Sequence, residues 1–329
     1  MKKRGIGYGC TFYGTGYGNG FPDVSVAEAE LNSDGKINVY VGATECGQGS
    51  DTIMRQIAAE SFGSSVEIIN YYSTDTDIMK DSGTAAASRQ TYNTGNALRL
   101  ASEKLKDRVI EKAKDLLNLN TTVGLKIENG EVFLNSFKAT KISLSEIASS
   151  LGDEKLREEA TFVAHSTEMD EETGQGCPYW PYTFGAAAVE VEVDTETGKV
   201  DIIRAASAQD VGRAINPELV EGQMDGGFAM GYGYAVFEDL NLKNGKIVNN
   251  RFTNYLIPTA MDMPELEKII IEDPESTGPY GAKGIGEPVM TYVAPAILNA
   301  IYDATGVRMT EIPVTPERLL KALKESETK

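Results

Sequence analysis

Short runs of alternating apolar and polar residues occur in pairs along the chain, and each pair is joined by a turn sequence. Residues 24–41, VSVAEAELNSDGKINVYV, alternate on both sides of Asp34-Gly35. The same pattern recurs around Asn129-Gly130, Gly198 and Asn244-Gly245. Alternation with a period of two around such turns is typical of antiparallel hairpins. The sequence therefore predicts four hairpins.

Other segments repeat apolar residues every three or four positions, which is typical of helices with one buried face. After residues 85–90 (AAASRQ), a stripe of this kind comprises Leu98, Ala101, Leu105, Val109, Ala113 and Leu116. Ser143 and Glu146 have the spacing of a capping box, which predicts a helix start. Further helices are expected after Gly49, from Asn216-Pro217, over 289–306 with its end at Gly306, and from Thr315-Pro316.

The hairpins dominate over the helices between them, so the predicted fold class is α+β and not a doubly wound parallel sheet. Residues 153–176 are acidic and poor in aromatic side chains, and we expect them to form an exposed connection. Two domains are therefore expected, residues 1–160 and residues 161–329. No aligned residue period supports an internal repeat.

Composition narrows the class of protein. The 329 residues are 41% hydrophobic and 24% charged, as in ordinary folded proteins, and the net charge is −18. This acidic balance argues against nucleic acid and anionic membranes as partners. The start MKKRGIGYGC lacks an apolar signal core, and no segment has about eighteen uninterrupted apolar residues. A soluble chain in the cytoplasm is expected.

Cysteine and histidine are too few for many kinds of site. Cys10, Cys46 and Cys177 are odd in number and far apart, so neither a disulfide framework nor a zinc or iron–sulfur ligand set is predicted. His165 is the single histidine, in FVAHST without a nucleophile elbow, which argues against a common zinc site and a serine or cysteine triad. An enzyme with this sequence would use carboxylates or an imported cofactor.

Two glycine- or alanine-rich loops are candidate ligand sites. Gly47 and Gly49 bracket the amide of Gln48 directly before a helix, where a phosphate, a carbonyl or a pterin edge could bind. The alternative is a plain strand-to-helix turn, because the third glycine of the dinucleotide fingerprint is missing. Residues 85–90 offer bare backbone, a hydroxyl and a guanidinium to a phosphate-bearing ligand. The alternative there is small-residue packing with Arg89 in solvent.

Two further candidates lie in the second half of the chain. Gln223 belongs to GQMDGGFAMGYG, where each helical glycine costs about 1 kcal/mol relative to alanine. Close approach of a cofactor or of another helix would explain these glycines. In GAKGIGEP, residues 281–288, Glu287 follows Gly286, and Pro288 suits the first position of a helix. Glu287 either faces a ligand from this loop or only complements the helix dipole.

Taken in order, ECGQGSDT, GTAAASRQTYNTGNA, DVGRAINPELVEGQMDGGFAMGYG and GAKGIGEP resemble the C-terminal molybdopterin-binding region of the xanthine dehydrogenase and aldehyde oxidase family. The resemblance covers essentially the whole chain. It implies a pair of molybdenum-cofactor-binding domains with antiparallel and mixed sheets packed by helices. One domain would carry the loops of residues 47–49 and 85–90, and the other would carry Gln223 and the loop of Glu287.

The resemblance also implies roles for single residues. Gln48 would contact the pterin dithiolene near molybdenum, with Gly47 and Gly49 allowing close approach, and Gln223 would be a second glutamine near the metal. Glu287, next to Gly286, would be the base in the hydroxylation of an electron-poor ring or an aldehyde. Because the dithiolene holds the metal, no protein metal ligand is expected. The loop that binds the cofactor and its nucleotide extension would comprise Ala86, Ala87, Ser88, Arg89 and Gln90.

The usual catalytic subunit of this family has a substantial first half with a GGGFGG-type loop, and this sequence has no counterpart to it. We therefore expect a split gene, in which a larger molybdopterin subunit supplies that half. Such a split resembles the medium molybdopterin subunit of nicotinate dehydrogenases, which convert nicotinate to 6-hydroxynicotinate. Companion FAD and 2Fe–2S subunits would pass the electrons to NADP.

The implied cofactor is molybdopterin cytosine dinucleotide with molybdenum and a labile sulfido or selenido ligand. Two other hypotheses stay open. One is a related hydroxylase for a purine, another N-heterocycle or an aldehyde. The other is a non-catalytic subunit that only completes the cofactor cradle.

Overall fold

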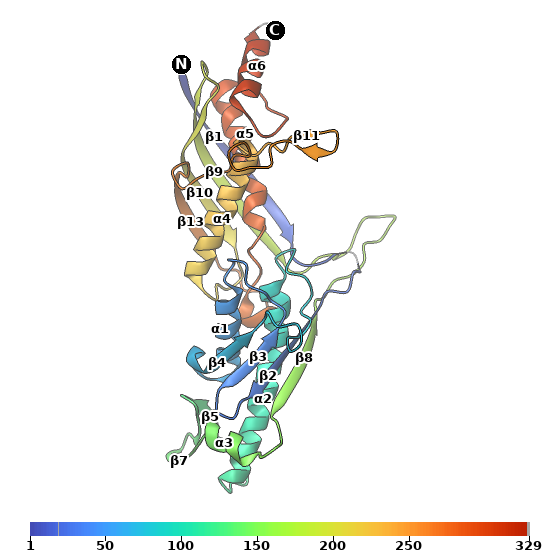
Figure 1. Ribbon diagram of the computed structural model, residues 1–329, viewed down its shortest axis with the longest axis vertical. Coiled ribbons are helices and arrows are strands. Elements are labelled where there is room, and N and C mark those ends of the chain that lie inside the picture. The colour runs from blue at the N-terminus through green and yellow to red at the C-terminus, as the bar shows by residue number, and fades with distance from the viewer. Residues whose placement is uncertain (19, 328–329) are drawn as a thin grey trace. The chain divides into compact units, whose positions relative to one another are not determined.

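The computed structural model describes residues 1–18 and 20–327, which form two compact units (Figure 1). The first unit comprises Met1–Tyr13, Tyr182–Asp273 and the chain from Ile285 onward. The second comprises Gly14–Pro181 and Pro274–Gly284. Both units combine helices with antiparallel or mixed sheets, which confirms the predicted α+β class. Within the described residues, no helix is both long and apolar enough to cross a membrane.

A four-stranded mixed sheet forms the centre of the first unit, in the order β1-β9-β10-β13. The hairpin of β9 and β10 is antiparallel, with Val189 opposite Ala205, and β13 joins β10 in parallel. Helices α4 and α5 pack together, and α5 packs on β9. The elements of this unit are β1 (Lys2–Gly14), β9 (Tyr182–Asp194), β10 (Val200–Asp210), α4 (Pro217–Val236), β11 (Leu242–Lys243), β12 (Lys246–Ile247), β13 (Glu265–Ile271), α5 (Pro288–Thr305) and α6 (Pro316–Glu327).

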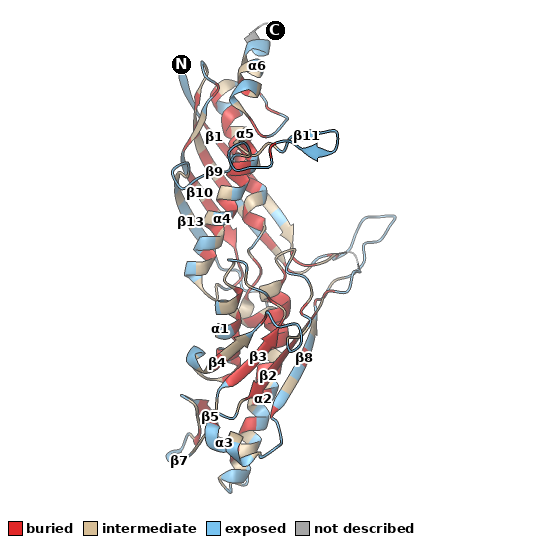
Figure 2. Cartoon of the chain, viewed as in Figure 1, coloured by how far each residue is buried: buried red, intermediate tan, exposed pale blue. Residues whose placement is uncertain are grey.

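The core of the first unit follows from the alternation in β9. Val189, Val191 and Val193 are buried toward the helices, while Glu190 and Glu192 lie on the other face of the sheet. Figure 2 shows the same contrast along β9, β10 and α5. Burying such a valine stabilises the fold by about 1.5–3 kcal/mol, which explains why this hairpin could be predicted from pattern alone.

Strand β1 was not predicted, because its inward positions are glycines and not apolar side chains. Gly5, Gly7 and Gly9 are buried, and the backbone of α5 lies against them. A Cβ added at Gly7 would lie 2.1 Å from the backbone nitrogen of Ala300. The glycine-rich start of the chain is therefore a strand whose missing side chains let the backbone of α5 pack directly against the backbone of the sheet.

The second unit contains two smaller sheets. One has the mixed order β4-β3-β2-β8, and the other has the order β5-β6-β7. Helix α2 packs on β2, β8 and α1. The predicted stripe on α2 is buried except at Leu116, near the helix end. The elements are β2 (Val24–Leu31), β3 (Ile37–Val41), α1 (Ser50–Phe62), η1 (Val66–Ile68), β4 (Ile69–Tyr72), α2 (Gln90–Leu116), β5 (Leu125–Glu128), β6 (Glu131–Leu134), β7 (Phe137–Ser143), α3 (Leu144–Ser150), β8 (Arg157–Val163) and η2 (Pro279–Gly281).

All four predicted hairpins are confirmed, as is the capping box of Ser143 and Glu146. Within the expected exposed connection of residues 153–176, Arg157–Val163 is a strand and not a connection, although only Ala160 in it is buried. These residues form β8, which pairs with β2, Ala160 opposite Ala27. The compact units also divide the chain differently from the expected boundary at residues 160 and 161. The reason is that β1 pairs with β9, while residues 274–284 join the second unit.

Candidate functional site

In the first unit, Glu287 lies at the start of α5, which begins with Pro288 as predicted. The side chain of Glu287 makes no capping hydrogen bond to its own helix. Instead, the Tyr13 hydroxyl donates a hydrogen bond to Oε2 of Glu287 over 3.0 Å. Glu287 is only partly buried, and Gly286 before it is exposed. The carboxylate is therefore held by a phenol from β1 and remains accessible from solvent.

Gln223 lies on α4, on the stripe that packs against α5. Gly227 and Gly231, one and two turns further on, approach α5 closely: an added Cβ would lie 2.7 Å and 2.6 Å from the Cβ atoms of Val289 and Val293. The two helices thus run in the same direction along this contact. Gln223 lies one turn before Gly227 on the same side of α4 and is partly buried. It is therefore near the end of the α4–α5 contact where α5 begins. Two of the helical glycines are therefore explained by helix packing, and Gln223 and Glu287 lie toward the same end of the helix pair.

In the second unit, Gln48 is held by its own loop. Its side-chain Nε2 donates to the carbonyl oxygen of Thr44 at 2.9 Å and to the hydroxyl of Ser50 at 3.2 Å. Its Oε1 accepts from the backbone N–H of Cys46 at 2.7 Å. Gly47 and Gly49 both have positive φ, at 107° and 88°, and an added Cβ at Gly47 would meet no atom within 4 Å. The loop places a fixed amide beside open space, with no side chain at Gly47 to cover it.

The backbone donors of this loop are occupied by Glu45. The N–H groups of Gly47, Gly49 and Asp51 donate to its carboxylate at 2.6, 2.9 and 3.1 Å. Desolvation raises the pKa of Glu45, but these hydrogen bonds outweigh it, and the pKa is lowered. The anion site expected at this strand–loop–helix junction is therefore filled by a side chain of the loop itself. Sequence analysis missed Glu45, although a carboxylate two residues before a glycine pair is a usable signal.

Residues 86–88 form a strained loop in the second unit. Ala87 and Ser88 have φ values of 54° and 55°, in the left-handed region that non-glycine residues rarely adopt. The N–H of Gly16 donates to the carbonyl oxygen of Ala87 at 2.8 Å. Gly284 lies so close to the carbonyl of Ser88 that any Cβ at residue 284 would collide with it. Strain of this kind persists when the surroundings hold it, and it is enriched at ligand sites.

Arg89 is fully buried, contrary to both sequence interpretations of this residue, as a phosphate ligand or as a solvent-exposed side chain. Its guanidinium pairs with Asp23 and donates to the carbonyl oxygens of Ser82 and Val24 and to the Ser25 hydroxyl. A buried arginine needs this number of partners, since an unpaired buried charge is very costly. Arg89 thus fixes the strained loop against β2.

Gln90, the first residue of α2, also has partners within the chain. Its Nε2 donates to the carbonyl oxygen of Gly83 at 3.3 Å, and its Oε1 accepts from the Thr94 hydroxyl. Ala86, Ala87 and Ser88 are partly exposed, so their backbone is the accessible part of this segment. The structure therefore separates residues that support the loop, Arg89 and Gln90, from residues that can meet a ligand.

Two groups of candidates result, one in each unit. The first unit carries Gln223 toward the same end of the helix pair as Gly286 and Glu287, and it adds Tyr13, which no local sequence signal marked. The second unit carries Gly47, Gln48 and Gly49 with Glu45, and Ala86, Ala87 and Ser88 with Arg89 and Gln90. Over the described ranges 1–18 and 20–327, no three His, Cys, Asp or Glu side chains are grouped to hold a metal ion. Open glycines, accessible strained backbone and a held carboxylate fit a large cofactor.

Comparison with known proteins supports a cofactor-binding chain. The family model described as molybdopterin cofactor-binding domain matches residues 1–264. The putative xanthine dehydrogenase molybdenum-binding subunit XdhA of Escherichia coli K12 is 36% identical over 323 residues, covering 96% of this chain and 42% of that protein.

Solved structures share the fold. Quinoline 2-oxidoreductase from Pseudomonas putida 86 superposes with a TM-score of 0.83 at 25% identity, covering 98% of this chain and 42% of its own. Aldehyde oxidoreductase from Desulfovibrio gigas gives a TM-score of 0.81 at 30% identity, with coverage of 98% and 33%. The chain therefore spans less than half the length of each of these three proteins.

Proposed function

Since the chain belongs to the molybdopterin cofactor-binding domain family, we propose that it is the molybdopterin-binding subunit of a multi-subunit molybdenum hydroxylase. The observation that supports a catalytic role best is the carboxylate of Glu287. It accepts a hydrogen bond from Tyr13, caps no helix and stays partly exposed.

Each candidate residue receives a proposed task. Glu287 accepts a proton at a carboxylate oxygen during hydroxylation, and Tyr13 orients that carboxylate. Gln48 and Gln223 present amides to the cofactor, while Gly47, Gly49 and Gly286 allow it to approach. The bare backbone of Ala86–Ser88 faces the pterin or its nucleotide, and Arg89 and Gln90 support that backbone from behind. When bound, the cofactor supplies the two-electron oxidation and the oxygen transfer.

For the substrate we propose a small electron-poor aromatic ring, with nicotinate and its conversion to 6-hydroxynicotinate as the preferred case. Two of the similar proteins are named for N-heterocycles, xanthine and quinoline, which supports this class. The aldehyde oxidoreductase supports the alternative of an aldehyde substrate. The proposed cofactor is molybdopterin cytosine dinucleotide with a labile sulfido or selenido ligand.

The proposed assembly includes a larger molybdopterin subunit, because this chain spans only 42% of the putative xanthine dehydrogenase subunit. FAD and 2Fe–2S subunits would carry the electrons to NADP. A cytoplasmic location suits the three cysteines, which are exposed as free thiols.

Replacing Glu287 by Gln tests the catalytic role in the native assembly. Turnover is expected to fall at least about a hundredfold, since the amide cannot accept the proton, while molybdenum and pterin content stay unchanged. Glu317, an exposed acid in the first turn of α6, provides a matched control, and Glu317→Gln should keep full turnover. Retained turnover in Glu287→Gln would favour the non-catalytic subunit.

Metal and nucleotide analysis of the native assembly tests the cofactor. We expect molybdenum together with a cytosine dinucleotide, and selenium analysis distinguishes the two labile ligands. Lack of both molybdenum and pterin would defeat the proposed function.

A turnover screen then ranks nicotinate against hypoxanthine and an aldehyde, and faster conversion of either competitor would exclude nicotinate as the preferred substrate.

A further inference from the structure

Within the described residues of the first unit, α4 and α5 pack on one face of the sheet, while on the other face α5 reaches only the rim, through Pro295 and Asn299. This other face carries the alternate residues of β1, β9, β10 and β13, whose side chains point away from the core. Tyr8 and Phe12 on β1 are 69% and 64% exposed, and Phe184 on β9 and Ile269 on β13 are also exposed. Large apolar side chains thus project into solvent from β1, β9 and β13.

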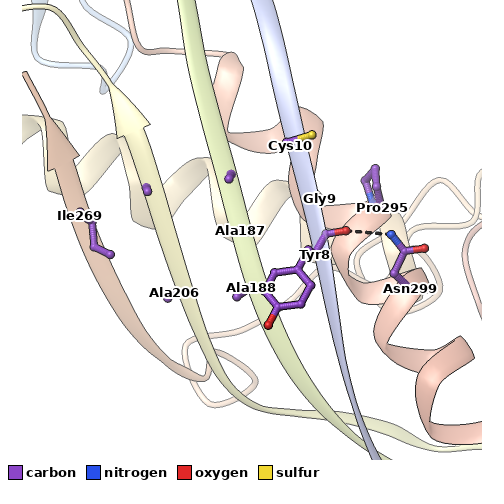
Figure 3. A pocket seen from close by; sticks show the side chains of 11 residues that line it. Tyr8, Gly9, Cys10, Ala187, Ala188, Ala206, Ile269, Pro295 and Asn299 are labelled. Atoms are coloured by element: carbon purple, nitrogen blue, oxygen red, sulfur yellow. Dashed lines mark hydrogen bonds between the residues drawn. The ribbon is translucent and has the colours of Figure 1, made fainter. Parts of the chain in front are cut away.

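Tyr8 and Ile269 border a groove, shown in Figure 3. Its volume is about 560 Å³, and its floor consists of small residues on β9 and β10. Tyr8 lies at one side of the floor and Ile269 at the other, with Ala188 and Ala206 between them. Beside it, the ring of Phe12 stacks on Tyr182 and Phe184 at centroid distances of 4.5 and 5.1 Å. The apolar surface is therefore continuous across the sheet and hollowed in its middle.

Beyond the groove, the same face of the sheet carries charged side chains. Lys2 and Arg4 pair with Glu192 at 2.6 and 3.1 Å, and Arg204 pairs with Glu190 at 2.7 Å. The three cations are more than half exposed, so these pairs are solvated and contribute little to stability. An apolar centre beside a solvated charged margin is the usual anatomy of a protein–protein interface.

The outer edge of β1 is closed by α5. Asp303 accepts from the backbone N–H of Ile6 at 2.9 Å, and the Asn299 amide donates to the carbonyl oxygen of Tyr8 at 2.8 Å. A partner would therefore find this edge already bonded and would not extend the sheet as an additional strand. The face, in contrast, offers side chains against which a partner can pack.

We propose that this apolar face binds the polypeptide that corresponds to the part of the relatives outside this chain. The proposal rests on the larger subunit in the proposed function and adds its docking surface. The putative xanthine dehydrogenase subunit and quinoline 2-oxidoreductase contain this fold in 42% of their chains, and the remainder of each chain must pack somewhere. A surface that such a neighbour covers in a longer chain is exposed when the neighbour is a separate polypeptide.

Hydroxyl-radical footprinting of the native assembly, compared with the isolated chain, tests the surface. Tyr8, Phe12 and Phe184 are expected to be oxidised several-fold more slowly in the assembly, and cross-links from this face should reach a polypeptide similar to the unmatched part of the relatives. Unchanged oxidation of these rings would overturn the proposal. Cross-links from this face to a second copy of the chain would also overturn it.

Substitutions test the same surface independently. Tyr8→Arg adds charge at one side of the groove, and Ala206→Arg fills its floor. Each should lower the yield of the complex with the larger subunit about tenfold or more, as loss of an interface anchor does. Val123→Arg, which introduces the same charge at a loop residue of the second unit that is 79% exposed, should leave the yield unchanged. Normal yield with Tyr8→Arg and Ala206→Arg would contradict the proposal.

Two measurements keep this inference separate from the proposed function. Circular dichroism of each isolated variant shows whether the chain still folds, and only folded variants are scored. Complex formation does not depend on turnover. An assembly in which the apolar face is protected but molybdenum is absent would therefore contradict the proposed function and not the docking surface. An assembly that contains molybdenum but leaves the apolar face unprotected would contradict the docking surface and not the proposed function.

Discussion

Tyr13 and Glu287 form the most specific contact of the candidate site at the scale of single residues. Tyr13→Phe removes the 3.0 Å hydrogen bond and leaves the ring in place. A hydrogen bond to a charged group contributes about 1.5–3 kcal/mol, so kcat should fall roughly ten- to hundredfold if that orientation matters in the transition state. Steady-state kinetics of the native assembly measures this. The control Tyr302→Phe changes a partly exposed tyrosine of α5 and should have no effect, whereas unaltered kcat in Tyr13→Phe would show that Tyr13 does not orient the base.

Glu45 gives a prediction about pH. Its folded-state pKa is lowered, so its contribution to stability is complete above the ordinary glutamate pKa and is lost as the pH falls through the lowered value. Glu45→Gln should therefore lower Tm most near about pH 7, and the difference from the wild type should close toward about pH 3. Thermal unfolding across this range measures it. A difference that grows on acidification would contradict the assigned hydrogen bonds.

The sequence marked some of these residues and missed others for a physical reason. Gln48, Gln223 and Glu287 carry distinctive side chains inside short motifs, so the family resemblance could indicate them. Tyr13 acts across 274 residues of sequence, and no local pattern connects it with Glu287. Arg89 looked like an available cation, because its burial depends on a distant partner, Asp23.

At the scale of elements, α4 contains glycines in contrasting environments, which gives a matched pair of substitutions. Gly231→Ala would place a Cβ 2.6 Å from that of Val293 and should destabilise the fold by about 1–3 kcal/mol through overpacking. Gly226 has no atom within 4 Å of an added Cβ, so Gly226→Ala should stabilise the helix by up to about 1 kcal/mol. Denaturant unfolding of the isolated chain compares the two. Equal effects would mean that α4 does not pack on α5 through Gly231.

Elements with local signals could be predicted, and elements defined by distant contacts could not. The Asp34-Gly35 turn fixes its hairpin by backbone chemistry alone, and the valines of β9 show which face is buried. Strand β1 lacks an apolar stripe, since its inward glycines make room for α5. Strand β8 opens with the charged residues Arg157, Glu158 and Glu159, and only its pairing with β2 defines it.

At the scale of the whole molecule, the chain alone is expected to retain little cofactor. It matches 42% of the putative xanthine dehydrogenase subunit, and the proposed larger subunit would supply the contacts made by the rest of that protein. Expressed alone in a host that makes the cofactor, the chain should contain less than about one tenth of the molybdenum per chain found in the assembly. Elemental analysis after gel filtration measures the ratio. Stoichiometric molybdenum in the lone chain would show that this polypeptide suffices for binding.

The division of the chain into interleaved units has a consequence for biosynthesis. Strand β1 ends at Gly14 and its partner β9 begins at Tyr182, so the ribosome makes roughly 170 residues between them. At about 5–20 residues per second, this delay is on the order of ten to thirty seconds. Most of the second unit can fold during that time, while β1 has no β9 to pair with. Tyr13 is synthesised 274 residues before Glu287, so the hydrogen bond between them can form only after all of the intervening chain has been made.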